Sequence, residues 1–317
     1  MTMLSRRTLI GSAAAGLALR AASAETAPPP QNIQASTDNS YRLTLDVAIG
    51  GKGPFRFLVD TGADRTVLAT EVAAALGLPD AGPVIVQGIT SAVPAQTALV
   101  PGLGFGSISL PPMAAPLLPR AALGADGYLG LDAIDGRAVT FDFVRHRLTI
   151  GEGAPVWLDP LHRPDEMLVR ASGRAGKLVS GDCSVDGVHT TAFIDSGAEV
   201  SVGNSRLFAA MAEHTGKTYD SQTPIPLIGV TGGIAQGRPV TVNALKFGTF
   251  GMFEYVGGTI LIADLPIFDI WGLANRPALL FGMNFLRGSS RFSIDYRRRE
   301  FLFRMADLRV ASRAGAA

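Results

Sequence analysis

Two short segments combine an aspartate, a small hydroxyl residue and a glycine directly after an apolar run. The first is Asp60 with Thr61 and Gly62, and the second is Asp195 with Ser196 and Gly197. A carboxylate at the end of a buried strand is costly unless it accepts hydrogen bonds or shares a proton. The glycine allows a sharp turn and a close approach of another segment. The hydroxyl can bond the backbone of a facing loop. The pattern favours acid–base chemistry, and a pair of structural turns is the alternative.

The two segments belong to a longer internal repeat with five matches in the same order. The matched pairs are residues 57–64 and 193–199, 88–90 and 229–231, 103–107 and 245–249, 128–134 and 280–286, and 141–145 and 294–298. Five ordered matches are hard to obtain by accident, and repeats of this kind define an architecture. The sequence therefore predicts a duplicated unit whose halves each contribute one aspartate.

Each aspartate must be positioned mainly by strands and turns. Apolar residues alternate with polar ones over residues 43–49, and a glycine-rich turn follows at residues 50–53. A short helix is expected at residues 70–76, ended by Gly77 and Pro79. Hydrophobic residues make up 47% of the chain and charged residues 17%, with 37 Gly and 20 Pro. This composition is typical of a packed, mainly β protein with many tight turns.

The first residues have the features of an export signal. Arg6 and Arg7 precede a weakly apolar run, and residues 22–24 form a small-residue cleavage pattern. Paired arginines in this place are typical of the twin-arginine route, which predicts a bacterial periplasmic protein. A buried helix with chance arginines is the alternative. No later run reaches the ~18 apolar residues of a membrane helix, so we expect no stable membrane span after cleavage.

We expect six segments along the chain. They are a twin-arginine-type signal peptide at 1–24, a flexible lead-in at 25–39, an N-terminal β lobe at 40–150, a connector at 151–167, a C-terminal β lobe at 168–304 and a tail at 305–317.

Charge, cysteine and histidine patterns narrow the classes of function. The net charge is +1, and removing the three signal-peptide arginines gives 1 − 3 = −2. A nearly neutral protein has no electrostatic reason to bind nucleic acid or anionic lipid. The single Cys183 excludes an internal disulfide and a thiolate metal cage. The four histidines lack metal-ligand spacing, so we expect no metal site; they are His146, His162, His189 and His214.

The sequence resembles the pepsin/retropepsin superfamily of aspartic proteases across residues 40–304. Residues 60–68, Asp-Thr-Gly-Ala-Asp-Arg-Thr-Val-Leu, look especially like the retroviral-type branch, in which alanine follows the glycine. In that family an apolar-apolar-glycine segment packs behind each catalytic loop, and Leu129-Gly130 and Phe281-Gly282 occupy that place. The resemblance implies a mainly β, bilobal pepsin-like/retropepsin-like fold with a cleft between two homologous lobes. The chain looks like two retroviral-type units joined in the pepsin manner.

The resemblance also implies a mechanism and a substrate class. Asp60 and Asp195 would be the catalytic dyad, supported by Thr61, Gly62, Ser196 and Gly197. Two carboxylates about 3 Å apart share one proton, and the ionised member activates a water that attacks a peptide bond. No cofactor is implied. The partner is a peptide or protein substrate, and a single chain with both aspartates should be active as a monomer.

Two glycine-containing segments are the candidate flaps that cover the substrate. Their residues are Gly88, Ile89 and Thr90 in the first half and Gly229, Val230 and Thr231 in the second. Neither segment has the tyrosine of the first flap in pepsin-like enzymes. The sequence therefore predicts an exported aspartic endopeptidase, and the alternative is a catalytically silent periplasmic peptide-binding module with the same fold.

Overall fold

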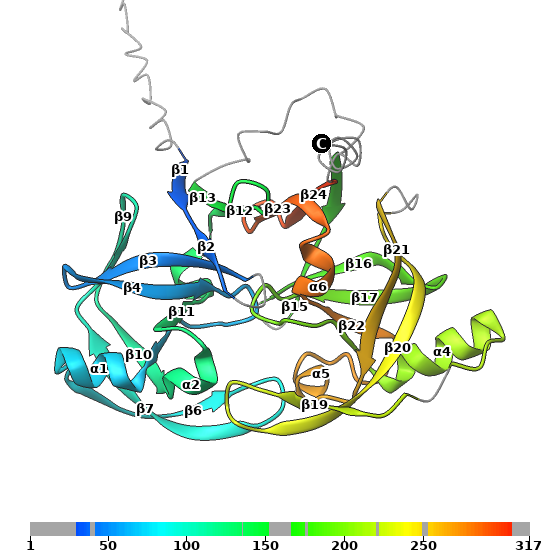
Figure 1. Ribbon diagram of the computed structural model, residues 1–317, viewed down its shortest axis with the longest axis horizontal. Helices are drawn as coiled ribbons and strands as arrows, with labels where there is room; N and C mark the ends of the chain where they lie inside the picture. The colour runs from blue at the N-terminus through cyan, green and yellow to red at the C-terminus, as the bar shows by residue number, and fades with distance from the viewer. Residues whose placement is uncertain are drawn as a thin grey trace, which may run out of the picture.

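The computed structural model describes residues 30–38, 42–134, 136–151, 166–174, 177–219, 222–248 and 253–305 (Figure 1). The predicted signal peptide, nearly all of the predicted connector and the tail after Met305 lie outside these residues. The described part is mainly β and consists of three sheets with short helices between their strands.

The first half of the chain forms a ten-stranded sheet. Its strands, in order across the sheet, are β6 (Asp80–Gln87), β7 (Ala92–Val100), β10 (Met113–Leu118), β5 (Val67–Ala69), β11 (Gly127–Leu129), β4 (Lys52–Val59), β3 (Leu43–Ile49), β8 (Leu103–Phe105) and β9 (Ile108–Leu110), with β2 (Ser36–Thr37) beside β3. Alternate residues of β3 are buried because one face of the strand packs on the core. β11 pairs parallel with β4 and antiparallel with β5, so it lies directly beside the strand that leads to Asp60.

The second half forms an eight-stranded sheet. Its strands are, in order, β15 (Ser172–Arg174), β16 (Lys177–Val185), β17 (Val188–Ile194), β22 (Ala278–Phe281), β18 (Val202–Gly203), β21 (Phe253–Ile262), β20 (Ile234–Phe247) and β19 (Ile225–Ile228). β16 also pairs with β20, so this sheet curls back on itself. β22 pairs parallel with β17 and antiparallel with β18, which places it beside the strand that leads to Asp195.

A six-stranded sheet joins the two halves and lies across the top of Figure 1. Its strands are β1 (Gln31–Gln34), β13 (Arg147–Gly151), β12 (Ala138–Asp142), β23 (Ser289–Asp295), β24 (Glu300–Met305) and β14 (Glu166–Arg170). β12 pairs with β23 around the register pair Thr140 and Ser293, whose buried hydroxyls are hydrogen-bonded to each other. The Phe141 and Phe292 rings stack beside them, with centroids 6.0 Å apart. This pairing holds the two halves in one fixed relation.

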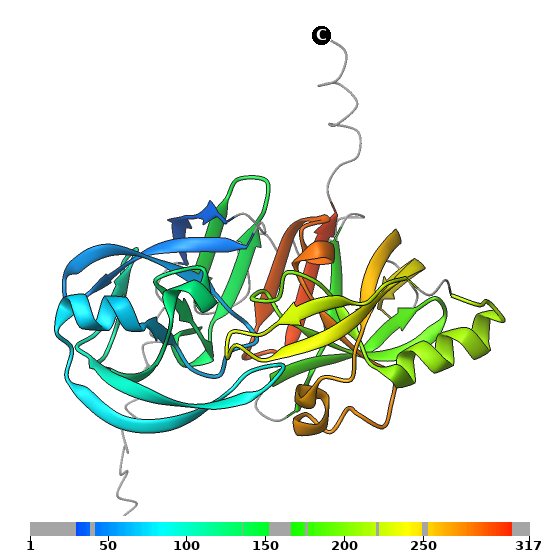
Figure 2. The ribbon, with the colours of Figure 1, turned by 60° about the horizontal axis from the view of Figure 1, so that its bottom comes forward.

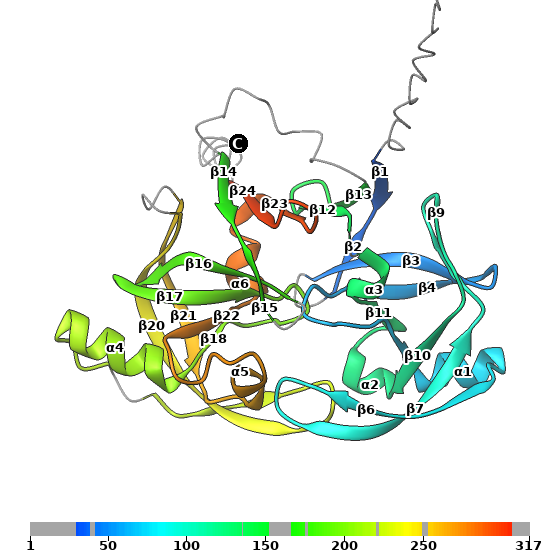
Figure 3. The same cartoon turned by 180° about the vertical axis from the view of Figure 1, so that it is seen from behind.

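Within the residues that the structure describes, six helices lie between the strands, and Figure 3 shows them from behind. They are α1 (Thr70–Leu76), α2 (Arg120–Leu123), α3 (Leu131–Ile134), α4 (Ser205–Thr215), α5 (Pro266–Ile270) and α6 (Met283–Leu286). The helix expected at residues 70–76 is confirmed, and it ends where Gly77 adopts a left-handed conformation with φ 63°. In the described part of the chain, no helix has the length and apolar character needed to cross a membrane.

The predicted flexible lead-in is wrong for part of its length. Residues 31–34 form β1, which pairs with β13, and residues 36–37 form β2, which pairs with β3. Ile33 and Ala35 are 7% and 5% exposed. Burial of these two side chains and pairing with distant strands override the local proline-rich and polar composition.

Candidate active site

The loop after β4 and the loop after β17 face each other and are hydrogen-bonded together. The Thr61 hydroxyl donates to the Ile194 carbonyl at 3.1 Å and accepts the Ser196 N–H at 3.0 Å. The Ser196 hydroxyl donates to the Val59 carbonyl at 2.8 Å and accepts the Thr61 N–H at 3.1 Å. Each hydroxyl therefore bonds two backbone groups of the opposite loop, and the two loops have little freedom to shift against each other.

Both aspartates are buried in these loops and have the same backbone donors. Asp60 is 9% exposed and Asp195 is 6% exposed. Oδ1 of Asp60 accepts the N–H groups of the residues two and three positions later, at 2.7 and 3.1 Å. Oδ1 of Asp195 accepts the equivalent pair at 2.9 and 3.1 Å. Hydrogen bonds donated to a carboxylate favour its ionised form and offset the cost of burying it.

The glycine of each loop lies against the carboxyl group of the other loop. A Cβ atom on Gly62 would lie 2.6 Å from Cγ of Asp195, and one on Gly197 would lie 2.5 Å from Cγ of Asp60. Non-bonded atoms do not approach so closely, so a side chain at either position would displace a carboxyl group. The two carboxyl groups are thus brought to one place, each covered by the opposite loop.

The apolar-apolar-glycine segments lie behind the two loops. The Asp60 N–H donates to the Leu129 carbonyl at the end of β11, and the Asp195 N–H donates to the Phe281 carbonyl at the end of β22; both distances are 3.0 Å. Each aspartate is therefore held in line with the neighbouring parallel strand.

Two pairs of side chains that we did not single out from the sequence complete this support. Oγ1 of Thr66 donates to Asp132 at 2.7 Å and accepts the N–H of the glycine after β11 at 3.3 Å. Oγ of Ser201 donates to Asn284 at 2.8 Å and accepts the N–H of the glycine after β22 at 2.9 Å. Asp132 and Asn284 stand at matched positions of the repeat, and that correspondence was the available signal.

The candidate flap residues lie at the tips of two hairpins. Gly88, Ile89 and Thr90 join β6 to β7, and Gly229, Val230 and Thr231 join β19 to β20. Figure 2 shows the two hairpins reaching toward each other from opposite halves of the molecule.

The two hairpin tips are hydrogen-bonded to each other. The Thr90 hydroxyl donates to the Gly233 carbonyl at 3.0 Å, and the hydroxyls of Ser91 and Thr231 are 2.8 Å apart. The Thr231 hydroxyl also lies 3.2 Å from the Ser91 carbonyl. Ile89 packs against an apolar cluster made entirely of second-half residues. The structure thus brings the tips of the two hairpins, which carry the flap candidates, into contact between the halves.

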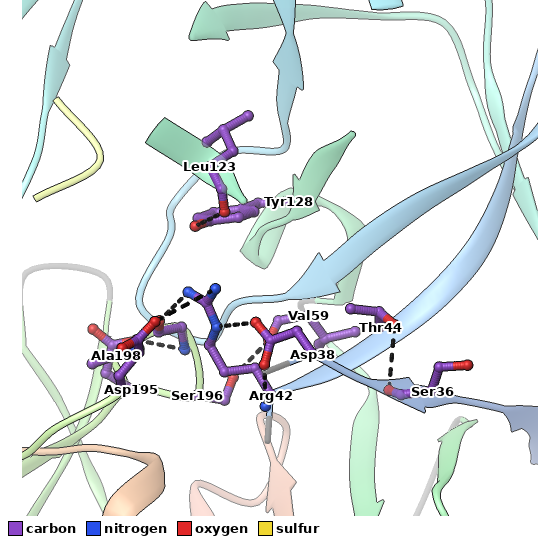
Figure 4. A network of polar contacts seen from close by, with 12 residues as sticks. Ser36, Asp38, Arg42, Thr44, Val59, Leu123, Tyr128, Asp195, Ser196 and Ala198 are labelled. Carbon is purple, nitrogen blue, oxygen red and sulfur yellow. Dashed lines mark hydrogen bonds and ion pairs between the residues drawn. The ribbon is translucent and has the colours of Figure 1, made fainter. Parts of the chain in front are cut away.

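Arg42 lies beside the Asp195 loop, and Asp38 and Tyr128 are its neighbours from the first half (Figure 4). The Arg42 guanidinium donates to the Gly197 carbonyl at 3.1 Å and to the Asp38 carboxylate at 2.7 Å. Burial raises the pKa of the Tyr128 phenol; the Arg42 cation opposes this shift, while Asp60 and then Asp195 add to it. Tyr128 is therefore a neutral hydroxyl within electrostatic reach of both carboxylates.

Other reactive groups do not gather at this place. Cys183 is buried, and burial raises the pKa of its thiol, so it is a poor nucleophile. Among the described residues no group of three or more His, Cys, Asp or Glu side chains is arranged to hold a metal ion. A cavity of about 610 Å³ lies at the turn between β3 and β4, and one of about 370 Å³ lies between β17 and α4. Neither includes a residue of the two aspartate loops.

The part of the chain around the first aspartate loop matches a known protein family. The family model described as Aspartyl protease matches residues 45–133, which include Asp60 and the first hairpin. This match supports an aspartyl protease family and suggests a protease function. No curated protein matches the chain.

Proposed function

We propose that this protein is an aspartic endopeptidase in which Asp60 and Asp195 form the catalytic dyad of a two-lobed, pepsin-like fold. The observation that carries the proposal is the reciprocal contact of the two loops, in which each carboxyl group lies against the glycine of the other loop. Two buried acids at one place strongly favour sharing a proton, because both cannot ionise side by side without a large energetic cost.

The shared proton gives the two acids different tasks. The ionised carboxylate accepts a proton from a water molecule, and the water oxygen bonds to the carbonyl carbon of the peptide. The protonated carboxyl donates to the carbonyl oxygen, which becomes a hydroxyl of the tetrahedral intermediate. When the carbon–nitrogen bond breaks, the carboxyl that took the water proton gives it to the leaving amine, and the other carboxylate takes a proton from a hydroxyl of the intermediate. The carbonyl re-forms and the dyad again holds one proton. Thr61, Gly62, Ser196 and Gly197 keep the two carboxyl groups in register during these steps.

The two hairpins are the proposed flaps, and an extended peptide would lie between them and the dyad. Strand-like pairing of the substrate main chain with the hairpins would give affinity without strict dependence on sequence. The hydrogen bonds between the hairpin tips would have to open to admit the substrate. This binding mode is suited to an internal peptide segment, which is the reason for proposing an endopeptidase.

We also propose a monomeric active form and a periplasmic location. Two retroviral-type units in one polypeptide would supply both aspartates, so the active form is a monomer. The twin-arginine-type signal would direct the protein to a bacterial periplasm. Specific activity that is independent of protein concentration supports the monomer, and activity that falls with dilution as a dimer is lost contradicts it.

The test is hydrolysis of a mixed pool of unstructured peptides by the protein without residues 1–24. We expect Asp-dependent cleavage that is lost in Asp60→Asn and in Asp195→Asn and inhibited by a pepstatin-type peptide. Thermal unfolding of the same samples shows whether that inhibitor binds. Peptide binding without cleavage at any pH would contradict the endopeptidase activity and favour the peptide-binding module.

A further inference from the structure

Arg42 connects the segment before β3 to the loop of the opposite aspartate. Its side chain is 11% exposed, and Nε donates to Oδ2 of Asp38 at 2.7 Å. Nη1 donates to the Gly197 carbonyl at 3.1 Å, and Nη2 lies 3.9 Å from the carboxylate of Glu199. In Figure 4 the guanidinium lies between the Tyr128 ring and the Asp195 loop. A cation from the first half is therefore fixed on the backbone of the second.

The carbonyl that Arg42 holds belongs to the same peptide group as a donor to Asp195. The carbonyl of Gly197 is bonded to the nitrogen of Ala198, and the Ala198 N–H donates to Oδ1 of Asp195 at 3.1 Å. A charge-assisted bond at the oxygen of a peptide group polarises the group and strengthens the N–H as a donor. The positive charge of Arg42 is thus relayed through one peptide group to the carboxyl of Asp195.

The other charged groups near Arg42 reduce this effect without reversing it. Asp38 is 13% exposed and lies on Nε, whereas the bond to Gly197 uses Nη1. Glu199 is 56% exposed, so solvent screens its charge. Tyr128 stays neutral because its pKa is raised. The directional bond to the Gly197 peptide therefore remains and favours negative charge on Asp195.

We infer that Arg42 is a positioning residue that makes Asp195 the ionised member of the dyad and leaves the shared proton on Asp60. The inference rests on the proposed function and refines it, because it assigns the two chemical roles. Asp195 then accepts the proton of the attacking water, and Asp60 donates to the carbonyl oxygen of the substrate. In this assignment Arg42 acts through the Gly197 peptide group.

The first test measures each carboxyl separately and needs no activity. Carbon-13 NMR of labelled aspartate follows the Asp195 carboxyl in Asp60→Asn protein and the Asp60 carboxyl in Asp195→Asn protein, each with and without Arg42→Gln. We expect Arg42→Gln to raise the pKa of Asp195 by about one unit and that of Asp60 by much less, since the relayed bond reaches only one loop. Arg42→Lys, which keeps the charge with fewer fixed donors, should give an intermediate shift.

The matched control is Arg291→Gln. Arg291 is also a partly buried arginine in an ion pair between the halves, with Asp142 at 2.8 Å, but it lies in the six-stranded sheet. Its loss should leave both carboxyl pKa values unchanged. Equal shifts of Asp60 and Asp195 in Arg42→Gln, or no shift of either, would overturn the assignment. If Arg42→Gln does not fold, the shifts of the Asp60 and Asp195 pKa values are compared in Arg42→Lys instead, and the same outcomes decide.

The second test is the pH dependence of kcat/KM. In Arg42→Gln the acid limb should move to higher pH by up to about one unit, because the group that must be ionised has lost stabilisation. A merely structural arginine would lower kcat or thermal stability without moving this limb. If Arg42→Gln cleaves peptides and its acid limb does not move, the role of Arg42 is overturned and the proposed endopeptidase activity stands. Absence of any Asp-dependent cleavage would overturn the endopeptidase, and the NMR titration would still decide the role of Arg42.

Discussion

The two aspartate loops give their carboxylates the same backbone hydrogen bonds, but the side chains behind them differ. In both loops one carboxylate oxygen accepts two N–H groups within 3.1 Å. Behind the first loop, β11 carries Tyr128, whose hydroxyl donates to the Leu123 carbonyl at 2.8 Å. The matched position on β22 is Leu280, which lies in an apolar cluster with Phe193 and Trp271. The rings of those two residues are 4.0 Å apart at their centroids.

This contrast shows which neighbouring groups the carboxyl pair requires and which of them can vary. The donors to Asp60 and Asp195 come from the loop backbone, so they depend on the turn and on its glycine. The residues behind the loops need only fill space and satisfy their own polar groups, so a hydrogen-bonded tyrosine and an apolar cluster are both suitable. Differences between the halves should therefore affect selectivity and proton placement more than the existence of the site.

The largest expected effect is the loss of either aspartate. Asp60→Asn and Asp195→Asn should each lower kcat by about 10³-fold or more, and the double variant should be little worse, because the pair acts as one unit. Thermal unfolding should change little in either variant. The control is Asp46→Asn, at an exposed position of β3. Near-normal turnover in one single variant would show that the two halves do not contribute equally.

A methyl group on either loop glycine is expected to have the next largest effect. Gly62→Ala and Gly197→Ala should each reduce the free energy of unfolding by ~1–3 kcal/mol, because Cβ overlaps the opposite carboxyl group. Displacement of that carboxyl should also lower kcat/KM by about 10²-fold. Gly181→Ala is the control, since its Cβ would meet no atom within 4 Å. Full activity in Gly62→Ala would contradict the close contact of the loops.

Exchange of the two hydroxyl residues should show that the loops are interchangeable. Ser196→Thr and Thr61→Ser should keep stability and activity close to the natural protein, because the four bonds use only a hydroxyl. Ser196→Ala should cost ~1–3 kcal/mol of unfolding free energy, because it leaves the buried Thr61 N–H without its acceptor. Denaturant unfolding measures both. A Ser196→Thr variant as unstable as Ser196→Ala would show that the two loops are not equivalent.

The smallest expected effect concerns the alanines that follow the loop glycines. In Ala63→Ser, Ala198→Ser protein each new hydroxyl can donate to a nearby carboxylate and favour its ionised form. The lower apparent pKa of the dyad should then fall by about half a unit. Activity is lost as the pH falls through that pKa, so the acid limb of kcat/KM should move to lower pH. An unmoved limb, or one shifted to higher pH, would contradict the prediction.

Local patterns predicted the parts of the site that depend on neighbours in the chain. The donors to each aspartate lie two and three residues later, so the Asp-hydroxyl-Gly pattern and the alanine after it already contain them. The helix at residues 70–76 depends on Gly77 directly after it. The internal repeat extended this local information to both halves. The catalytic role of the two aspartates stays a prediction until activity is measured.

Interactions between distant residues were beyond reach of such patterns. β1 is stabilised by β13, more than a hundred residues later, and its local composition favours a flexible segment. Arg42 precedes an ordinary strand, and only the folded chain brings it to Gly197, 155 residues away.

The sequence by itself determined which residues can ionise, turn and donate, because these are properties of residue types and their immediate neighbours. The tertiary structure decided which of them meet. The contact of the two loops, the bonds between the hairpin tips and the bond from Arg42 to the Gly197 carbonyl all join residues from the two halves, which the six-stranded sheet holds together. Electrostatic effects depend on distance in space, so the proposed difference between Asp60 and Asp195 can arise only in the folded protein.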